Sequence, residues 1–251
     1  MPLTVPEMRD AIIGDNSKER SAFLAAFSRN LGPIVCEATK AHHALDRMIS
    51  IAEPTDRMRR ICMFLHAALN SAVSSTSLLV EGYPLPSGHM MRHYAEAIAM
   101  AMMCADVEGR VLEVFDGDPR RYPVHKSLER LQRRGIARRL RSLLGFDPSR
   151  WREFIAISRF YDQHSHASAL SMAFHFTLGS TEELIVGAHF DPAKRRPFSL
   201  ELKRRRTAFR VLKELTRILS HVLPPKKRSK SSRRPQNRRA KPRANGEADA
   251  D

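Results

Sequence analysis

The stretch FSLELKRRRTAFRVLKELTRILSHVL, residues 198–223, decides the fold class of this chain. Its apolar residues recur every three or four positions, as in a helix with one buried face. They are Ala208, Val211, Leu212, Leu215, Ile218, Leu219 and Val222. The opposite side carries the cations Lys203, Arg204, Arg205, Arg206, Arg210, Lys213 and Arg217. The stretch therefore predicts a long helix that packs against others and ends at Pro224–Pro225.

Helical periodicity also recurs upstream of this stretch. It predicts helices at 33–51, 56–81, 87–108 and 148–163. We expect Pro33 in the first turn of the first and Ser87 as the N-cap of the third. Residues 97–105 are apolar almost all round, so the third helix should be the central one. An arginine-rich stretch at 124–144 should be short helical material.

The segment before the last helix has a different spacing of apolar residues. Apolar residues alternate with others at Met172, Phe174, Phe176 and Leu178, and again at Leu184, Val186, Ala188 and Phe190. A Gly-Ser turn separates the two runs, which favours a β-hairpin at about 170–190. We thus expect a mainly α fold over 1–223, a helical bundle with one β-hairpin inserted before the C-terminal helix. Residues 224–251 should form a disordered basic tail.

Charge points to polyanionic partners. The formal net charge is +16, of which the tail contributes +7 and the other 223 residues +9. Nucleic acid or an anionic surface would suit this balance. The tail cations are Lys226, Lys227, Arg228, Lys230, Arg233, Arg234, Arg238 and Arg239. Without aromatic residues among them, we expect contact with phosphates rather than base readout. The alternative is a tail that only improves solubility.

Cysteine usage and hydropathy indicate a cytoplasmic protein that makes no membrane contact. Cys36, Cys62 and Cys104 are odd in number and far apart, so we expect buried, reduced thiols. The first 20 residues lack the apolar core of a signal peptide. The longest purely apolar run, 97–105, is much shorter than a membrane span of about 20 residues.

The segment SRFYDQHSHAS, residues 158–168, gathers a cation, two imidazoles and several hydroxyls at a helix end. Arginine can hold a phosphate bidentately, and histidine can exchange a proton with a ribose hydroxyl at neutral pH. Arg159 and His164 therefore form a candidate site for cutting RNA without metal. The alternative is a salt bridge at Arg159 and a turn cap at His164.

Arg92 and Glu96 form a second candidate cluster. They are four apart on the expected central helix, hence neighbours. Glu96 could orient Arg92 towards an anionic ligand shared with Arg159, or the two could form a structural ion pair. A small-ligand sensor built on this pair is a third function class.

No cofactor or metal is expected. His164 and His166, with His175 or His189, could in principle bind zinc, but no cysteine lies nearby and the HxH spacing is common. The chain has no P-loop, GxGxxG, HExxH or GxSxG motif.

The helix order, the Gly82–Pro84 break, Arg92-x3-Glu96 and Arg159-x4-His164 resemble uncharacterised bacterial proteins of the HEPN superfamily. The resemblance covers about 58–222. It implies a helical domain, a homodimer and metal-independent ribonuclease activity in a toxin or defence system. His166 matches the longer, six-residue motif spacing. Two features depart from the family, namely Phe160 after the motif arginine and a hairpin directly after the motif.

The leading hypothesis is thus a HEPN-like nucleic-acid-associated protein, with RNA preferred over DNA. Arg159, His164 and His166 would be catalytic, and Arg92 and Glu96 would bind phosphate or give structural support. The alternative is a non-catalytic helical interaction module that contacts nucleic acid through its basic tail.

Overall fold

A computed structural model describes most of the first 222 residues of the chain. The described residues are 4–53, 55–106, 111, 138, 141–142, 144–145, 147–163, 174, 177 and 186–222. Within these ranges the regular structure is helical and no strand occurs. The expectation of a mainly α fold is confirmed.

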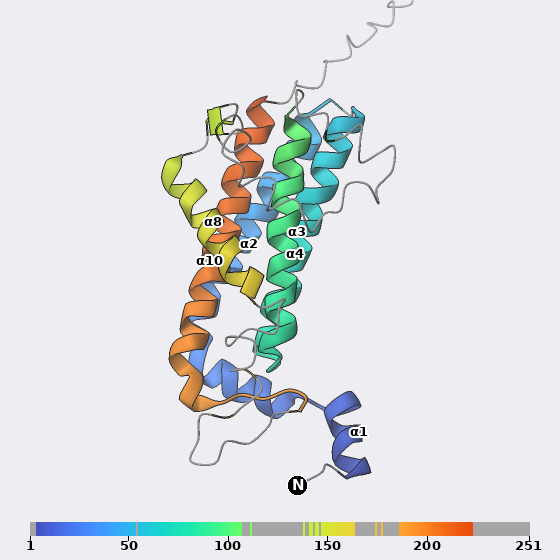
Figure 1. Ribbon diagram of the computed structural model, residues 1–251, viewed down its shortest axis with the longest axis vertical. Coiled ribbons are helices and arrows are strands. Elements are labelled where there is room, and N and C mark those ends of the chain that lie inside the picture. Colours follow the sequence, from blue (N-terminus) through green and yellow to red (C-terminus); the bar gives the residue numbers. More distant parts are fainter. Residues whose placement is uncertain are drawn as a thin grey trace, which may run out of the picture.

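The helices follow one another in the order α1 (Val5–Ile13), α2 (Ser17–Ile51), α3 (Asp56–Val80), α4 (Pro84–Ala105), α8 (Pro148–Asp162), the 3₁₀ turn η3 (Pro192–Lys194) and α10 (Arg195–Val222). Figure 1 shows α2, α3, α4 and α10 side by side as a bundle, with α8 alongside and α1 apart at the lower end. The closest packing joins α3 to α4 and α2 to α10. Every residue of 97–105 is buried, so α4 is the central helix, as predicted.

Two predicted helices have the expected bounds to within a residue. The structure has α3 at Asp56–Val80 and α8 at Pro148–Asp162. Thr55 caps α3 by accepting a hydrogen bond from the Met58 amide at 3.2 Å. Asp147 caps α8 in the same way, from the Ser149 amide at 2.7 Å. Side-chain caps of this type define helix starts well.

The predicted start of the first long helix at Pro33 is wrong, because α2 begins at Ser17 and Pro33 lies inside it. An interior proline removes one backbone hydrogen bond and bends a helix. The helix nevertheless continues because its buried stripe does, from Phe23 and Phe27 to Ile34 and Ala41. Figure 1 shows α2 crossing the lower end of the bundle before it rises beside α10.

The predicted N-cap at Ser87 is also wrong. The helix α4 begins three residues earlier, at Pro84, which suits the first turn because proline lacks the amide that would stay unpaired there. Ser87 is buried instead, and its hydroxyl donates to the backbone oxygen of Ser75 in α3 at 2.6 Å. The hydroxyl therefore links α4 to α3 and does not cap α4.

The cysteine expectation is partly wrong. Cys104 is buried and Cys62 half-buried, whereas Cys36 is exposed. In α2 the buried stripe passes through Ile34 and Glu37, which leaves Cys36 on the outer side.

The hairpin at about 170–190 lies largely outside the described residues, as do most of 124–144 and the tail from 224. The hairpin and the disordered tail therefore stay predictions. The described residues of the hairpin region, 174, 177 and 186–190, lie in no strand.

Among the described residues, α3 alone is long and apolar enough to cross a membrane by length and composition. In the bundle, 44% of that apolar window is buried against other helices. A core helix of a bundle has the same composition, so the expectation of no membrane contact stays a prediction.

Candidate functional site

In the part of the chain that the structure describes, cations gather around a hollow between α8 and α10. An open pocket of about 500 Å³ is lined by Arg159 and Phe160 of α8 and by Lys203 and Arg204 of α10. Arg159 and Lys203 are exposed, and Arg204 is partly so. The two helices run antiparallel beside one another in Figure 1. We call this hollow the α8–α10 groove.

Arg204 is held in place on the floor of the α8–α10 groove. Its guanidinium carbon lies 3.4 Å from the ring centroid of Phe160, a cation–π contact. Its Nη1 also lies 3.5 Å from Oε1 of Glu201. Glu153 is the one acidic residue among the described residues that line the groove, and its Oε2 lies 2.6 Å from Nη1 of Arg150. The lining therefore carries a net positive charge.

Further cations lie on the same faces of α8 and α10 as the residues that line the groove. Arg152 lies seven residues before Arg159 on α8, and Arg196 and Arg210 flank Lys203 by seven on α10. Seven residues are close to two helical turns, so each set shares a face. Arg152 and Arg196 are exposed and Arg210 is half-buried. The basic surface thus extends beyond the groove along both helices.

Arg159 is exposed on α8 and lines the α8–α10 groove. Among the described residues it makes no ion pair or side-chain hydrogen bond, in contrast to the alternative of a helix-end salt bridge. The helix α8 ends at Asp162, and Gln163, its C-cap, still lines the groove. His164 follows directly in the chain. His164, His166 and all the tail cations from Lys226 to Arg239 lie outside the described residues.

Arg92 and Glu96 form a partly buried ion pair. The Nε of Arg92 lies 2.9 Å from Oε1 of Glu96, and their side chains are 18% and 10% exposed. The Nη1 of Arg92 also lies 3.1 Å from Asp162, the last residue of α8. With two carboxylates around it, Arg92 joins α4 to the end of α8 that carries Arg159. This geometry favours structural support; a phosphate-binding role for the pair stays a prediction.

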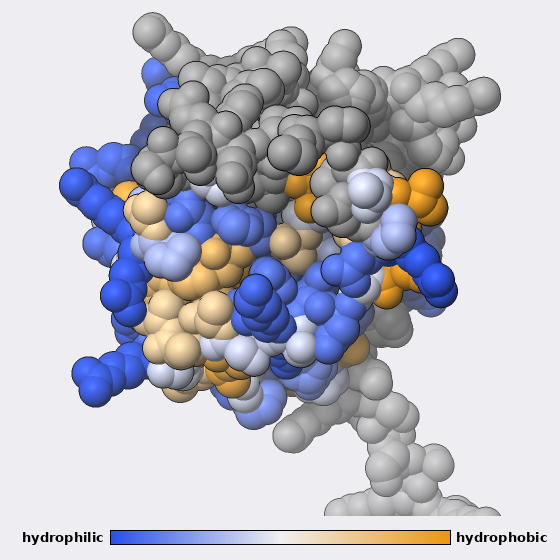
Figure 2. Space-filling view, turned by 90° about the horizontal axis from the view of Figure 1, so that it is seen from below, coloured by the Kyte–Doolittle hydropathy of each residue, from blue (hydrophilic) through white to orange (hydrophobic). Residues whose placement is uncertain are grey.

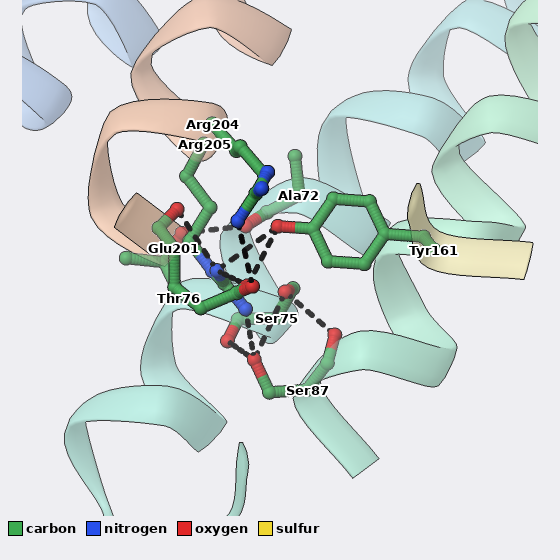
Figure 3. Close-up of polar contacts among 8 residues, drawn as sticks. All are labelled: Ala72, Ser75, Thr76, Ser87, Tyr161, Glu201, Arg204 and Arg205. Atoms are coloured by element: carbon green, nitrogen blue, oxygen red, sulfur yellow. Dashed lines mark hydrogen bonds and ion pairs between the residues drawn. The ribbon is translucent and has the colours of Figure 1, made fainter. Parts of the chain in front are cut away.

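Beneath the groove lies a polar network that the sequence did not reveal (Figure 3). Arg205 is completely buried. Its Nη1 donates to Oε2 of Glu201 at 2.6 Å and to the hydroxyl of Tyr161 at 3.2 Å. Its Nη2 donates to the hydroxyl of Ser87. The network therefore connects α10 to both α8 and α4.

Glu201 links the buried network to the groove. Its Oε2 accepts hydrogen bonds from Arg205 and, at 2.7 Å, from Tyr161, while Oε1 faces Arg204. Burial raises the pKa of the Tyr161 hydroxyl well above its ordinary value, so it remains a proton donor at neutral pH. Burial lowers the pKa of Arg205, but Tyr161 and Glu201 outweigh that effect and raise it. Arg205 therefore stays charged, and its hydrogen bond to Glu201 fixes the helix turn that presents Arg204.

Placing Arg205 on the charged outer side of its helix was wrong. The sequence did contain a signal for its burial. Counting back from Ala208 in steps of three and four along the apolar stripe leads to Arg205, Glu201 and Phe198, all of them buried. An Arg and a Glu four apart on a buried stripe can pair with each other, which makes their burial tolerable.

The described residues contain no group of three His, Cys, Asp or Glu side chains that could hold a metal ion. Comparisons of the chain with family models, with curated proteins and with solved structures give no match.

Proposed function

We propose that the α8–α10 groove binds the sugar–phosphate backbone of RNA. The observation that carries the proposal is the convergence of Arg159, Lys203 and Arg204 on one open groove with Phe160 in its floor. Cations at several points suit successive phosphates, and an aromatic ring paired with arginine suits a base in a single strand. Single-stranded RNA exposes both features at once.

The proposed reaction is metal-independent cleavage, as the HEPN resemblance implies. Arg159 binds the non-bridging oxygens of the scissile phosphate and stabilises their growing charge. His164 takes the proton of the 2′-hydroxyl, whose oxygen bonds to phosphorus while the bond to the 5′-oxygen breaks. The leaving oxygen takes a proton from a protonated His166. The products are a cyclic phosphate and a 5′-hydroxyl, without any metal or cofactor.

Three further expectations belong to this proposal. The basic tail adds phosphate contacts that hold the RNA near the groove. We also expect a β-hairpin at about 170–190, which would follow the motif in the chain and precede α10. A homodimer would bring two copies of the Arg-x4-His motif together, as the resemblance implies.

Binding without cleavage is the second candidate function. It is supported by the groove lining, which includes no histidine among the described residues. In that case the protein would be a helical interaction module whose groove and tail bind nucleic acid.

Fluorescence anisotropy with labelled single-stranded RNA tests the groove. We expect Lys203→Glu to weaken binding and to reduce the salt dependence of log Kd by roughly 0.7 for each phosphate that the variant no longer neutralises. The matched control is Lys18→Glu, the same charge reversal on α2, outside the groove. A DNA of the same sequence should bind more weakly. Equal effects of the two reversals would show that binding depends on overall charge only.

A further inference from the structure

The floor of the α8–α10 groove is apolar, although cations line its walls. Its apolar residues are Ala156, Ile157 and Phe160 of α8 and Leu200 of α10. Those on α8 follow the three- and four-residue spacing of one helix face. Leu200 is 45% exposed and Ala156 is exposed as well, so both are accessible from the groove. Phosphates are recognised by charges and hydrogen-bond donors, so the apolar floor suits another part of the ligand.

Arg204 presents a flat surface to the groove. Its guanidinium carbon lies 3.4 Å from the centroid of the Phe160 ring. A guanidinium standing upright at this distance would push one of its nitrogens into the ring, so the two planes lie roughly parallel. Phe160 therefore covers one face of the guanidinium. Because Arg204 lines the groove and its side chain is 31% exposed, the opposite face is available to a ligand.

Two neighbours on α10 complete the surroundings of this open face. Leu200 precedes Arg204 by four residues, one helical turn, so their side chains are neighbours. The exposed cation Lys203 lies in the same turn. A planar ring stacked on Arg204 would thus have an apolar side chain on one side and a cation within reach of an attached phosphate. A nucleotide combines these two features, and its base can stack only if it is unpaired and free of its neighbours.

A second hollow, at the lower end of the bundle, has apolar walls but no such cation. It has a volume of about 460 Å³ and lies between the Gly82–Pro86 segment that opens α4 and the Val186–Phe198 segment that leads into α10. Figure 2 views this end and shows hydrophobic surface gathered within a hydrophilic surround. The lysine of this hollow, Lys194, is buried and faces Asp191 and the Phe174 ring. The α8–α10 groove differs because its cations are exposed beside the apolar floor.

We infer that the α8–α10 groove holds one unstacked base of the RNA, which lies on the open face of Arg204 and against Leu200. This inference rests on the proposed function and names its substrate more closely, as single-stranded RNA with a base that can leave its neighbours. A sugar–phosphate chain without bases is not sufficient. Arg204 acts through its planar surface as well as its charge, and such stacking accepts any of the four bases.

Two oligomers of equal length and charge separate the base from the backbone. One is a short oligoadenylate, and the other is the same sugar–phosphate chain without bases. Both carry the same label and 2′-O-methyl sugars, so the proposed reaction cannot cleave them. Fluorescence anisotropy with the full chain should show the oligoadenylate bound at least about fivefold more tightly, the smaller contribution expected of one stacked base. Phosphate contacts, including any from the tail, are common to both oligomers.

Arg204→Lys keeps the charge of Arg204 but removes its planar group. This variant should weaken the oligoadenylate several-fold and leave the chain without bases unchanged. Arg206→Lys, the same change at an exposed position of α10 that does not line the groove, is the matched control and should affect neither oligomer. Leu200→Ser removes the apolar neighbour without changing any charge, and it should act as Arg204→Lys does. Its control is Val73→Ser, at an exposed apolar position of α3.

The variant Lys203→Glu distinguishes failure of this inference from failure of the proposed function. If Lys203→Glu weakens both oligomers while the two bind with equal affinity, the base site is overturned and backbone binding in the groove stands. The same conclusion holds if Arg204→Lys weakens both oligomers equally. If Lys203→Glu weakens neither oligomer more than Lys18→Glu does, the proposed function fails and the base site fails with it.

Discussion

Arg205 and Glu201 form an ion pair inside the bundle, with 2.6 Å between Nη1 and Oε2 and side chains that are 0% and 4% exposed. A buried ion pair tolerates the loss of both partners better than the loss of one, because a single remaining charge is uncompensated. Arg205→Met should therefore lower the free energy of unfolding by about 3–5 kcal/mol, and Glu201→Met by a similar amount. The double variant should lose clearly less than the sum.

Urea unfolding of the two single variants and the double variant measures this coupling. The matched control is the pair of the exposed Arg217 and the half-buried Glu214, with 2.8 Å between Nη2 and Oε1. Arg217→Met should change stability by less than about 1 kcal/mol. Additive losses at Arg205 and Glu201 would contradict the network.

Tyr161 gives a finer test of the same network. Its hydroxyl donates to Glu201 at 2.7 Å, and Tyr161→Phe removes this bond without changing the ring. We expect a loss of about 1–3 kcal/mol, since a buried carboxylate oxygen loses a donor. If Glu201 positions Arg204 through this network, the variant should also weaken RNA binding in the groove. Thermal unfolding and anisotropy measured on the same preparation separate the two effects.

Gly82 cannot become alanine without a local rearrangement. Its φ is +90°, and a Cβ there would lie 2.8 Å from the backbone nitrogen of His189. Gly145 also has a positive φ, +56°, but a Cβ there would meet open space. Gly145→Ala should therefore cost about 1–2 kcal/mol from the backbone conformation alone, and Gly82→Ala more. Equal losses in chemical denaturation would argue against the close approach of the two segments.

The packing of α2 on α10 should weaken in acid. Burial raises the pKa of Glu37, but hydrogen bonds from Lys213, at 3.0 Å, and from Lys40 outweigh it and lower the pKa below its ordinary 4.5. The stabilisation is thus complete above pH 4.5 and disappears as the pH falls through the lower, folded value. Glu37→Gln should be less stable than the natural chain at pH 7, and the difference should shrink towards pH 3. A constant difference across this range would exclude the ion pairs as its cause.

The three cysteines should react at very different rates. Cys36 is exposed, Cys104 is buried, and burial raises the pKa of Cys62 to about 11. At pH 8 the thiolate fraction of Cys62 is then about one part in a thousand, and the thiolate is the reactive form. Iodoacetamide followed by mass spectrometry should show one fast modification, which Cys36→Ser removes. Two fast sites in the natural chain would contradict the burial of Cys62.

Sequence patterns predicted the helices well where local signals and burial agree. The helix starts predicted at Asp56 and Pro148 are correct, and the apolar run 97–105 lies at the centre of the bundle. The patterns failed where packing overrides local preference. Proline usually lies in the first turn of a helix, but the buried stripe of α2 continues on both sides of Pro33, so the helix runs through it.

For the candidate site, sequence spacing indicated Arg159 but not its surroundings. Lys203 and Arg204 come from a helix more than 40 residues later, and only the packing of α10 on α8 brings them together. Arg205 stands in a run of cations like its neighbours, but it is buried whereas Lys203 and Arg206 are exposed. A run of cations alone does not say which of them faces inward, whereas its register with Ala208 does.

The central claim is that Arg159 and His164 cleave RNA bound in the α8–α10 groove. Its most direct test is the cleavage of labelled RNA by the full chain in excess EDTA, compared with Arg159→Ala, His164→Ala and two control variants, Arg47→Ala and His221→Ala, at exposed helix positions outside the groove. The account predicts cleavage without metal, abolished in the first two variants and retained in the controls. RNA that binds the groove but stays intact with every protein would contradict the catalytic claim and leave the binding module.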